Sequence, residues 1–167
     1  VACASEALHV FDLKDEQIQE GVESFTGVAG RLELVSEKDG VQIYNDTTAT
    51  TPDATLAGLR AVSKEKNVVL IAGGTDKQID PKFLIESIGV YAKAVILLPG
   101  TGTDRLFPAL VGKIQELHKI ENLQEAVKKA QELAQEGDVI LFSPGYASFG
   151  LFKNEYDRGE QFNELVK

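Results

Sequence analysis

The chain has 167 residues, 43% of them hydrophobic and 26% charged, a composition typical of one globular domain with room for a fragment of another. Its formal net charge of −9 argues against nucleic acid as a partner, because phosphate backbones are bound by clustered Lys and Arg. No apolar run approaches the roughly 20 residues that span a bilayer, and no basic segment followed by an apolar one predicts a secretory signal.

The start of the chain predicts two short helices and a linker. Residues 2–10 carry small and apolar side chains at helical density, and Asp12 is expected to cap a second helix that ends near Val22. The sequence Thr-Gly-Val-Ala-Gly at 26–30 then interrupts the periodicity and predicts a linker. Because two short helices cannot bury a core of their own, we interpret residues 1–27 as the remnant of a neighbouring domain.

Two residue counts bear on the origin of the chain. It contains no methionine, so we expect it to be an excised piece of a longer protein that does not begin naturally at Val1. Its single cysteine, Cys3, cannot form an internal disulfide, and no Cys/His cluster suits a metal ion. A reducing, cytoplasmic location is therefore expected.

After the linker, patterns typical of strands and helices follow one another. Residues 31–35 and 41–44 alternate like two paired strands, with a turn at Gly40 between them. The predicted helices are 52–62, 81–88, 104–117, 123–135 and 154–166, and the predicted strands are 67–72, 94–98 and 138–142. The last three strands are near-continuous apolar runs, as in sheets covered on both faces. Residues 28–167 are therefore expected to form an α/β domain, Rossmann-like and doubly wound, with a mostly parallel sheet flanked by helices.

Ligands of such sheets bind at the carboxyl ends of the strands. The loops expected there, 45–51, 72–80, 99–104 and 143–150, are all rich in Gly, Thr, Ser and Asp. We therefore expect the functional residues among them.

The loop after the second strand is the most informative stretch. Four threonines and Asp46 stand where a helix begins, so hydroxyls, a carboxylate and free backbone N–H groups meet at one point. Such a point suits a polar, partly anionic ligand. The alternative is an ordinary helix start, with Thr51 as N-cap and Pro52 as the first helical residue.

Two later loops offer further polar groups. Gly73 and Gly74 allow a close backbone approach to a ligand, and Lys77 supplies a cation, although a flexible turn with a solvated lysine explains the same residues. Ser143 and Ser148 supply hydroxyls without the glycine spacing of a nucleophilic serine, and we expect no hydrolase triad. The loop 100–104 is interpreted as a plain connection.

Arg31 begins the first predicted strand, and Asp46 ends its partner strand. The two side chains are expected to place a cation and a carboxylate near a cleft between domains. The alternative is an exposed ion pair that contributes little to stability.

Four motifs in this order resemble the Mur ligase family, and the second and fourth are typical of its D-glutamate-adding branch. They are Phe25-Thr26-Gly27 with Arg31-Leu32-Glu33, Tyr44-Asn45-Asp46-Thr47-Thr48-Ala49-Thr50, Gly73-Gly74-x-x-Lys77, and Ser143-Pro144-x-x-Ala147-Ser148-Phe149-x-x-Phe152-Lys153-Asn154 with Arg158-Gly159. The resemblance covers nearly the whole chain, from the end of a central ATPase domain to the C-terminus.

The resemblance implies an ATP-dependent amide-forming ligase of peptidoglycan precursor synthesis. ATP phosphorylates the carboxylate of UDP-N-acetylmuramoyl-L-alanine, and the amine of D-glutamate attacks the acyl phosphate. The C-terminal domain brings the amino acid and closes about a hinge at the linker. By the same resemblance, Arg31 and Asp46 would contact ATP, and Thr50, Lys77, Ser148 and Phe149 would hold D-glutamate. No residue of the chain is expected to be catalytic or to bind a metal, and a monomer without a membrane span is expected.

The chain departs from the family pattern at three positions. Gly30 replaces a histidine, Thr48 replaces a lysine near the substrate, and Glu155 replaces an aromatic wall of the amino-acid pocket. No G-x-x-G-K-[ST] sequence is present. We therefore expect the phosphate-binding loop and the Mg²⁺ ligands in the missing central domain, and no ATP turnover by this chain alone.

Three other interpretations remain open. One is the C-terminal domain of a folate or poly-γ-glutamate ligase, against which the segment 143–154 argues. Another is a stand-alone Rossmann module that binds a nucleotide or an anion, and a third is an interaction domain. A stand-alone module would tolerate mutation of Arg31, whereas the ligase would lose rate.

Overall fold

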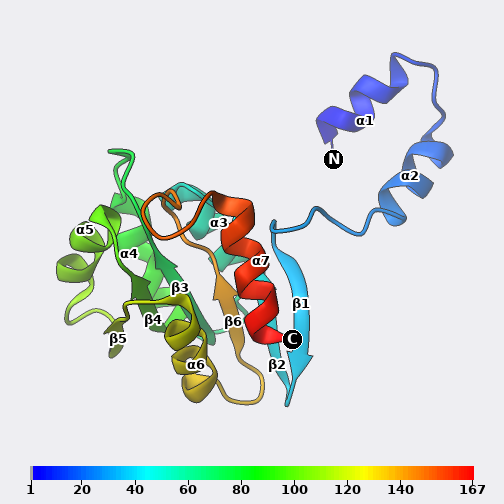
Figure 1. Ribbon diagram of the computed structural model, residues 1–167. Coiled ribbons are helices and arrows are strands. Elements are labelled where there is room, and N and C mark those ends of the chain that lie inside the picture. Colours follow the sequence, from blue (N-terminus) through cyan, green and yellow to red (C-terminus); the bar gives the residue numbers. More distant parts are fainter. Residues whose placement is uncertain (1) are drawn as a thin grey trace.

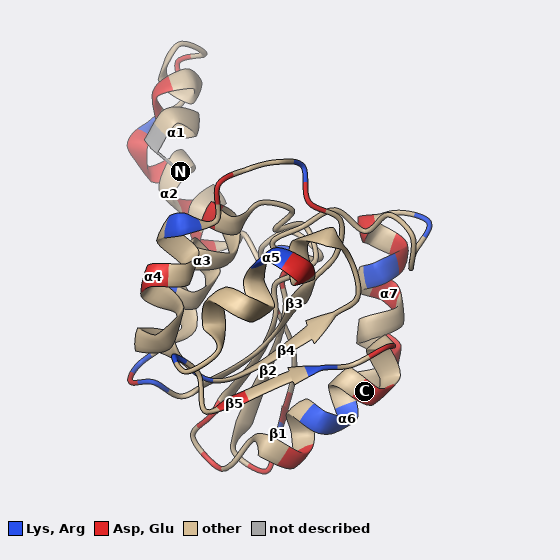
Figure 2. Cartoon of the chain, turned by 90° about the vertical axis from the view of Figure 1, so that its left-hand side faces the viewer, with Lys and Arg blue, Asp and Glu red and all other residues tan. Residues whose placement is uncertain are grey.

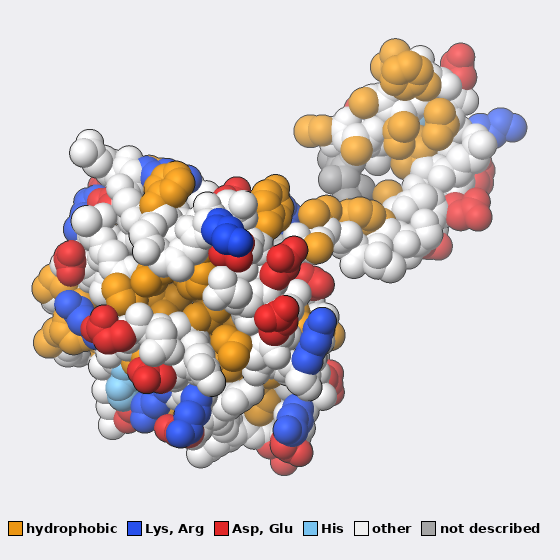
Figure 3. All heavy atoms as spheres, in the orientation of Figure 1, with side chains coloured by type: hydrophobic (Ala, Val, Ile, Leu, Met, Phe, Trp, Pro, Cys, Tyr) orange, Lys and Arg blue, Asp and Glu red, His pale blue; other side chains and the backbone are white. Residues whose placement is uncertain are grey.

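The computed structural model describes residues 2–167, and the expectation about Val1 falls outside the described residues. Helices α1 (Ala2–His9) and α2 (Asp15–Glu23) stand apart from the α/β body, to which an extended segment joins them (Figure 1). Apolar side chains are largely exposed in this outlying part, where Figure 3 shows them gathered: in the turn between the two helices Val10 is 79% exposed and Phe11 75%, whereas Ile18 of α2 is buried.

The predicted N-cap of the second helix is wrong. Asp12 lies in a left-handed turn, with φ 58°, two residues before the residue that caps α2, Lys14. The Gln17 side chain accepts a hydrogen bond from the Lys14 backbone N–H at 3.1 Å, which satisfies one of the donors that a helix start leaves free. An aspartate is a common N-cap, but tight turns also favour it, and here the turn prevails.

The body is one six-stranded sheet in the order β1-β2-β6-β3-β4-β5. The strands are β1 (Glu33–Lys38), β2 (Val41–Asn45), β3 (Val68–Gly73), β4 (Ala92–Leu98), β5 (Glu116–Lys119) and β6 (Val139–Phe142). β1 is antiparallel to β2, and all the other pairs are parallel. This confirms the mostly parallel sheet.

Helices cover both faces of the sheet (Figures 1 and 2). α3 (Pro52–Val62), α4 (Lys82–Tyr91) and α5 (Thr101–Leu110) pack on one face, and α6 (Leu123–Leu133) and α7 (Glu155–Val166) pack on the other. Along β3 the side chains alternate between the layers: Leu70 joins the core under α3–α5, and Ile71 joins the core under α6 and α7. The apolar runs are therefore strands buried on both faces, as predicted.

Acidic and basic residues are mixed on the side of the chain drawn in Figure 2, on the helices and on the edge strand β5. Within residues 2–167, no helix is long and apolar enough to cross a bilayer.

One predicted helix is wrong at both ends. The helix expected over 104–117 begins at Thr101 and ends at Leu110, and the short edge strand β5 follows it. The apolar positions from Leu106 to Leu117 continue the helical spacing, so the pattern hides the break. Gly112, with φ 80°, adopts a backbone conformation that ends the helical course. The other helices and strands begin and end within a few residues of their predicted limits.

Candidate functional site

The loops at the carboxyl edge of the sheet are bonded to one another. The N–H of Gly73 donates to the carbonyl of Pro144 at 2.9 Å, and Thr75 and Ala147 exchange two backbone hydrogen bonds. The N–H of Gly145 donates to the carbonyl of Ala49 at 2.8 Å. The loops after β2, β3 and β6 therefore form one continuous surface, at the place where parallel α/β sheets bind ligands.

Asp46 lies at the end of β2 and is 5% exposed. One of its carboxylate oxygens accepts from the Leu32 backbone N–H at 3.1 Å, and the other accepts from the Ser143 hydroxyl at 2.7 Å. Burial raises the pKa of Asp46, and the bonds from Ser143 and Leu32, together with the charge of Arg31, offset part of that rise. The carboxylate thus holds the backbone next to Arg31.

Arg31 is exposed and stands beside Asp46. Both residues line an open hollow of about 390 Å³, together with Leu32, Thr48, Ala49 and small residues of α3. Gly30 and Leu32, on either side of Arg31, have φ of 69° and 46°. The carbonyl of Gly30 accepts from the N–H of Thr48 at 3.0 Å and from its hydroxyl at 2.9 Å. Thr48 therefore fastens the end of the linker to the domain.

Thr50 and Lys77 are brought together from two different loops. The Lys77 ammonium donates to the Thr50 hydroxyl at 3.1 Å, across 27 residues of sequence. The ammonium is exposed and can donate further hydrogen bonds. Thr51 also caps α3, accepting from the N–H of Ala54 at 3.3 Å, so the helix-start interpretation of this loop holds as well.

Ser148 and Phe149 lie on the neighbouring loop. Ser148 is 5% exposed, and its hydroxyl has no hydrogen-bond partner among residues 2–167. The Phe149 ring is 67% exposed, while its carbonyl accepts from the Thr75 hydroxyl at 2.9 Å. The pairing of Thr75 with Ala147 therefore places the Lys77 loop beside the loop that carries Ser148 and Phe149.

The paired glycines serve the packing of these loops. A Cβ on Gly73 would collide with the carbonyl of Leu98, and one on Gly74 would collide with the carbonyl of Ala147. Both residues also have φ above 100°. Backbone-to-backbone contact thus explains the pair without a ligand.

Arg158 contributes a connection that the sequence did not show. It is 1% exposed, and it donates to the Thr47 hydroxyl at 3.1 Å, the Thr47 carbonyl at 2.8 Å and the Tyr146 carbonyl at 3.2 Å. Burial lowers the pKa of Arg158 to about 10, an effect that Glu155 partly opposes. Glu155, expected at the pocket wall, begins α7, and its carbonyl accepts from the Thr47 hydroxyl at 2.8 Å. The motif containing Arg158 was visible, but its burial was not.

The edge thus presents an exposed ammonium, an exposed guanidinium and a free hydroxyl around loops with fixed backbones. Such a set binds carboxylates and phosphates, because cations and oriented donors compensate the loss of solvent around anions. The Ser143 hydroxyl, which donates to the Asp46 carboxylate, is fully buried, so this pair does not present a nucleophile at the surface of the edge. Binding and orientation of an anionic substrate is the chemistry that these residues support.

Known proteins match this chain in sequence. The family model described as "Mur ligase, glutamate ligase domain" matches residues 30–145. The UDP-N-acetylmuramoylalanine–D-glutamate ligase of Roseiflexus sp. (strain RS-1) is 42% identical over 170 residues, covering 100% of this chain and 36% of that protein. The ligase of the same name from Clostridium botulinum is 42% identical over 161 residues, covering 93% of this chain and 34% of that protein. The chain therefore spans about a third of the length of these relatives.

Solved structures share the fold. The UDP-N-acetylmuramate-alanine ligase of Thermotoga maritima has a TM-score of 0.69 at 17% identity, covering 95% of this chain and 35% of that one. The folylpolyglutamate synthase of Mycobacterium tuberculosis, solved with ADP and AMPPCP, has a TM-score of 0.63 at 14% identity, covering 93% of this chain and 36% of that one. The family model, the extent of the sequence identity and the shared fold agree, and the chain belongs to the Mur ligase family.

Proposed function

We propose that the full-length protein is an ATP-dependent ligase that joins D-glutamate to UDP-N-acetylmuramoyl-L-alanine through an acyl phosphate. The observation that carries this proposal is the 42% identity, over the whole chain, to a ligase with that name. In this proposal residues 28–167 are the domain that binds the amino acid, and residues 1–27 are the end of the central ATPase domain.

D-Glutamate would bind at the joined loops after β2, β3 and β6. A dicarboxylate needs a cation and oriented donors, and Lys77 offers the first while Thr50 and Ser148 offer the second. The existing contact between Lys77 and Thr50, at 3.1 Å, supports a common binding place for these side chains. The exposed ring of Phe149 would cover the aliphatic part of the substrate.

ATP would supply the phosphoryl group that activates the carboxylate of the precursor. Arg31 fits a phosphate, because its side chain is exposed beside the hollow and the residues on either side of it, Leu32 and Gly30, are held by Asp46 and Thr48. Both oxygens of Asp46 already accept hydrogen bonds, so its part in nucleotide binding would be to orient Arg31. Ligands of Mg²⁺ are expected in the central domain.

In the same proposal the protein works as a cytoplasmic monomer, and the C-terminal domain closes on the central one. The extended segment between α2 and β1 supports a hinge there (Figure 1). Since Gly30 and Leu32 are bonded to Thr48 and Asp46, the hinge would lie before Gly30. Closure of this kind brings the amine to the activated carboxylate and excludes water.

A phosphate-release assay on the full-length protein tests the proposal. The protein receives ATP and UDP-N-acetylmuramoyl-L-alanine, with D-glutamate, L-glutamate or L-lysine in parallel, and the assay is repeated with Lys77→Ala and with Lys128→Ala as control. Lys128 lies on α6, and its side chain is exposed. Release with D-glutamate alone, lost in Lys77→Ala and kept in Lys128→Ala, supports the function and the role of Lys77.

Other results would replace the proposal. Release with another amino acid would retain the family and change the substrate. Release only with a folate acceptor and L-glutamate would favour a folylpolyglutamate ligase, whose fold this chain shares. No release with any acceptor, together with nucleotide binding that Arg31→Ala leaves unchanged, would favour a binding module.

A further inference from the structure

The turn that carries Lys77 has a defined shape of its own. It runs from Asp76 to Ile79 after β3, and Gln78 within it adopts the left-handed conformation, with φ 63°. The N–H of Gln78 donates to the carboxylate of Asp76 at 2.8 Å. An aspartate that bonds two residues ahead closes a local turn, so the backbone on both sides of Lys77 is constrained.

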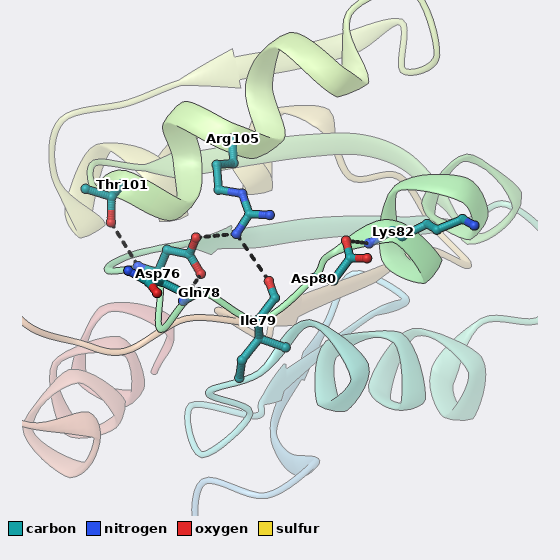
Figure 4. Close-up of polar contacts among 7 residues, drawn as sticks. All are labelled: Asp76, Gln78, Ile79, Asp80, Lys82, Thr101 and Arg105. Atoms are coloured by element: carbon teal, nitrogen blue, oxygen red, sulfur yellow. Dashed lines mark hydrogen bonds and ion pairs between the residues drawn. The ribbon is translucent and has the colours of Figure 1, made fainter.

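Helix α5 holds this turn from outside (Figure 4). The Thr101 hydroxyl accepts from the N–H of Asp76 at 2.9 Å. One nitrogen of Arg105 donates to the Asp76 carboxylate at 2.5 Å and to the carbonyl of Ile79 at 3.3 Å. Thr101 and Arg105 are four residues apart and so lie on one face of the helix. The two side chains therefore bind the first and last residues of the turn, with Lys77 between them.

The start of α5 is itself joined to the loops of the site. The N–H of Gly102 donates to the carbonyl of Gly74 at 2.9 Å, and the Thr103 hydroxyl donates to the carbonyl of Leu98. The buried ring of Tyr146 occupies the space where a Cβ on Gly102 would lie. The start of α5 is thus fastened to the same loops as the turn that it supports.

The charges agree with the geometry. The Asp76 side chain is 10% exposed and that of Arg105 is 44% exposed. Burial raises the pKa of Asp76, but the hydrogen bonds from Arg105 and from the backbone outweigh it, so the net pKa is lowered. Asp76 is therefore ionised at neutral pH and is compensated by Arg105. Its carboxylate does not compete with a substrate carboxylate for the Lys77 ammonium, because Arg105 and Gln78 already engage both of its oxygens.

We propose that Arg105, acting through Asp76 and Ile79, is a positioning residue that sets where the Lys77 ammonium stands opposite Thr50. This rests on the proposed function, in which Lys77 binds D-glutamate. A variant without Arg105 still has the Lys77 ammonium, but the turn that carries Lys77 loses its side-chain bonds to Asp76 and Ile79. Substrate binding then costs the entropy of ordering that turn again.

Steady-state kinetics of the full-length protein test the inference. Arg105→Met is expected to raise the KM for D-glutamate about tenfold, with kcat and the KM for ATP nearly unchanged. Arg105→Lys is expected to give a smaller rise, since an ammonium does not reproduce the geometry of a guanidinium. The matched control is Arg60→Met: Arg60 is an exposed arginine near the end of α3, away from the carboxyl edge.

A double mutant separates positioning from a general loss of structure. In a Lys77→Ala background, Arg105→Met is expected to cause no further loss of D-glutamate binding, measured directly by calorimetry, because the group that it positions is gone. Hydrogen exchange supplies a measurement that needs no substrate. The peptide covering residues 75–80 should exchange faster in Arg105→Met and at the wild-type rate in Arg60→Met.

The outcomes are distinct. An unchanged KM for D-glutamate in an active Arg105→Met protein, an equal rise in the KM for ATP, or unchanged exchange over 75–80 each overturns the inference. Absence of D-glutamate-dependent release by the wild-type protein overturns the proposed function instead. Even then, exchange over 75–80 still decides whether Arg105 holds the turn.

Discussion

Arg158 and Thr47 are joined by two hydrogen bonds, 2.8 Å to the Thr47 carbonyl and 3.1 Å to its hydroxyl, in a place where the guanidinium is 1% exposed. A third bond reaches the carbonyl of Tyr146. None of the ion pairs among the described residues involves Arg158, although the charge of Glu155 acts on it. One buried cation thus connects α7 to the loop after β2 and the loop after β6, which are both part of the candidate site.

We expect Arg158→Lys to lower the free energy of unfolding by about 2 kcal/mol, because a single ammonium nitrogen does not reproduce the geometry by which three guanidinium nitrogens reach these acceptors, and a buried carbonyl is left unpaired. Urea unfolding of the full-length protein measures the change. The control is Lys128→Met on the surface of α6, for which a change within about 0.5 kcal/mol is expected. Equal stability of the Arg158→Lys and control variants would contradict the bridging role.

Gly102→Ala is expected to destabilise the protein by about 1–3 kcal/mol, because the new methyl group enters the space of the Tyr146 ring. Gly89→Ala in α4 is the matched control. Its Cβ would make ordinary contacts with the carbonyl of Lys113 at 3.6 Å and with the Ile114 side chain at 3.9 Å, so the helix propensity of alanine should stabilise the protein by up to about 1 kcal/mol. Thermal unfolding of both variants measures the two effects. Changes of the melting temperature in the same direction would refute the packing argument.

Asp46 should make stability depend on pH in a defined direction. Burial raises the pKa of Asp46 in the folded protein above its usual value of 3.8. The contribution of Asp46 to the free energy of unfolding is therefore complete below pH 3.8 and is lost as the pH rises through the raised pKa of the folded protein. The free energy of unfolding of the wild type, compared with that of Asp46→Asn, should therefore fall over this pH interval and remain constant at higher pH. Urea titrations of both proteins at a series of pH values supply the comparison. A difference that grows in favour of the wild type with rising pH would show that hydrogen bonds outweigh burial.

Arg31→Met is expected to raise the KM for ATP about tenfold while the KM for D-glutamate changes little. Thr48→Val should produce a smaller rise, because it removes one of the two bonds to Gly30 and leaves the cation in place. Kinetics of the full-length protein at two salt concentrations measure both effects, and the effect of Arg31 should weaken as salt rises. If Thr48→Val raises the KM for ATP as much as Arg31→Met does, the position of the linker backbone, rather than the charge of Arg31, determines the KM for ATP.

Local patterns were sufficient for much of the fold. Helix α3 was predicted from Pro52 to Val62, which are its bounds, because a capping threonine followed by proline acts within one turn of chain. The apolar runs of β3, β4 and β6 likewise predicted buried parallel strands. β5 was missed, since a four-residue edge strand has too little pattern to be separated from the preceding helix.

The order of residues alone thus determined the α/β class, the family and the candidate residues, whose roles stay predictions. Only the tertiary structure showed that β6 inserts between β2 and β3, that Lys77 meets Thr50, and that Arg158 is buried against Thr47. These contacts join residues 27 and 111 positions apart. These contacts form only when the helices and strands pack together. The spacing of residues within one helix or strand does not indicate which elements it will pack against.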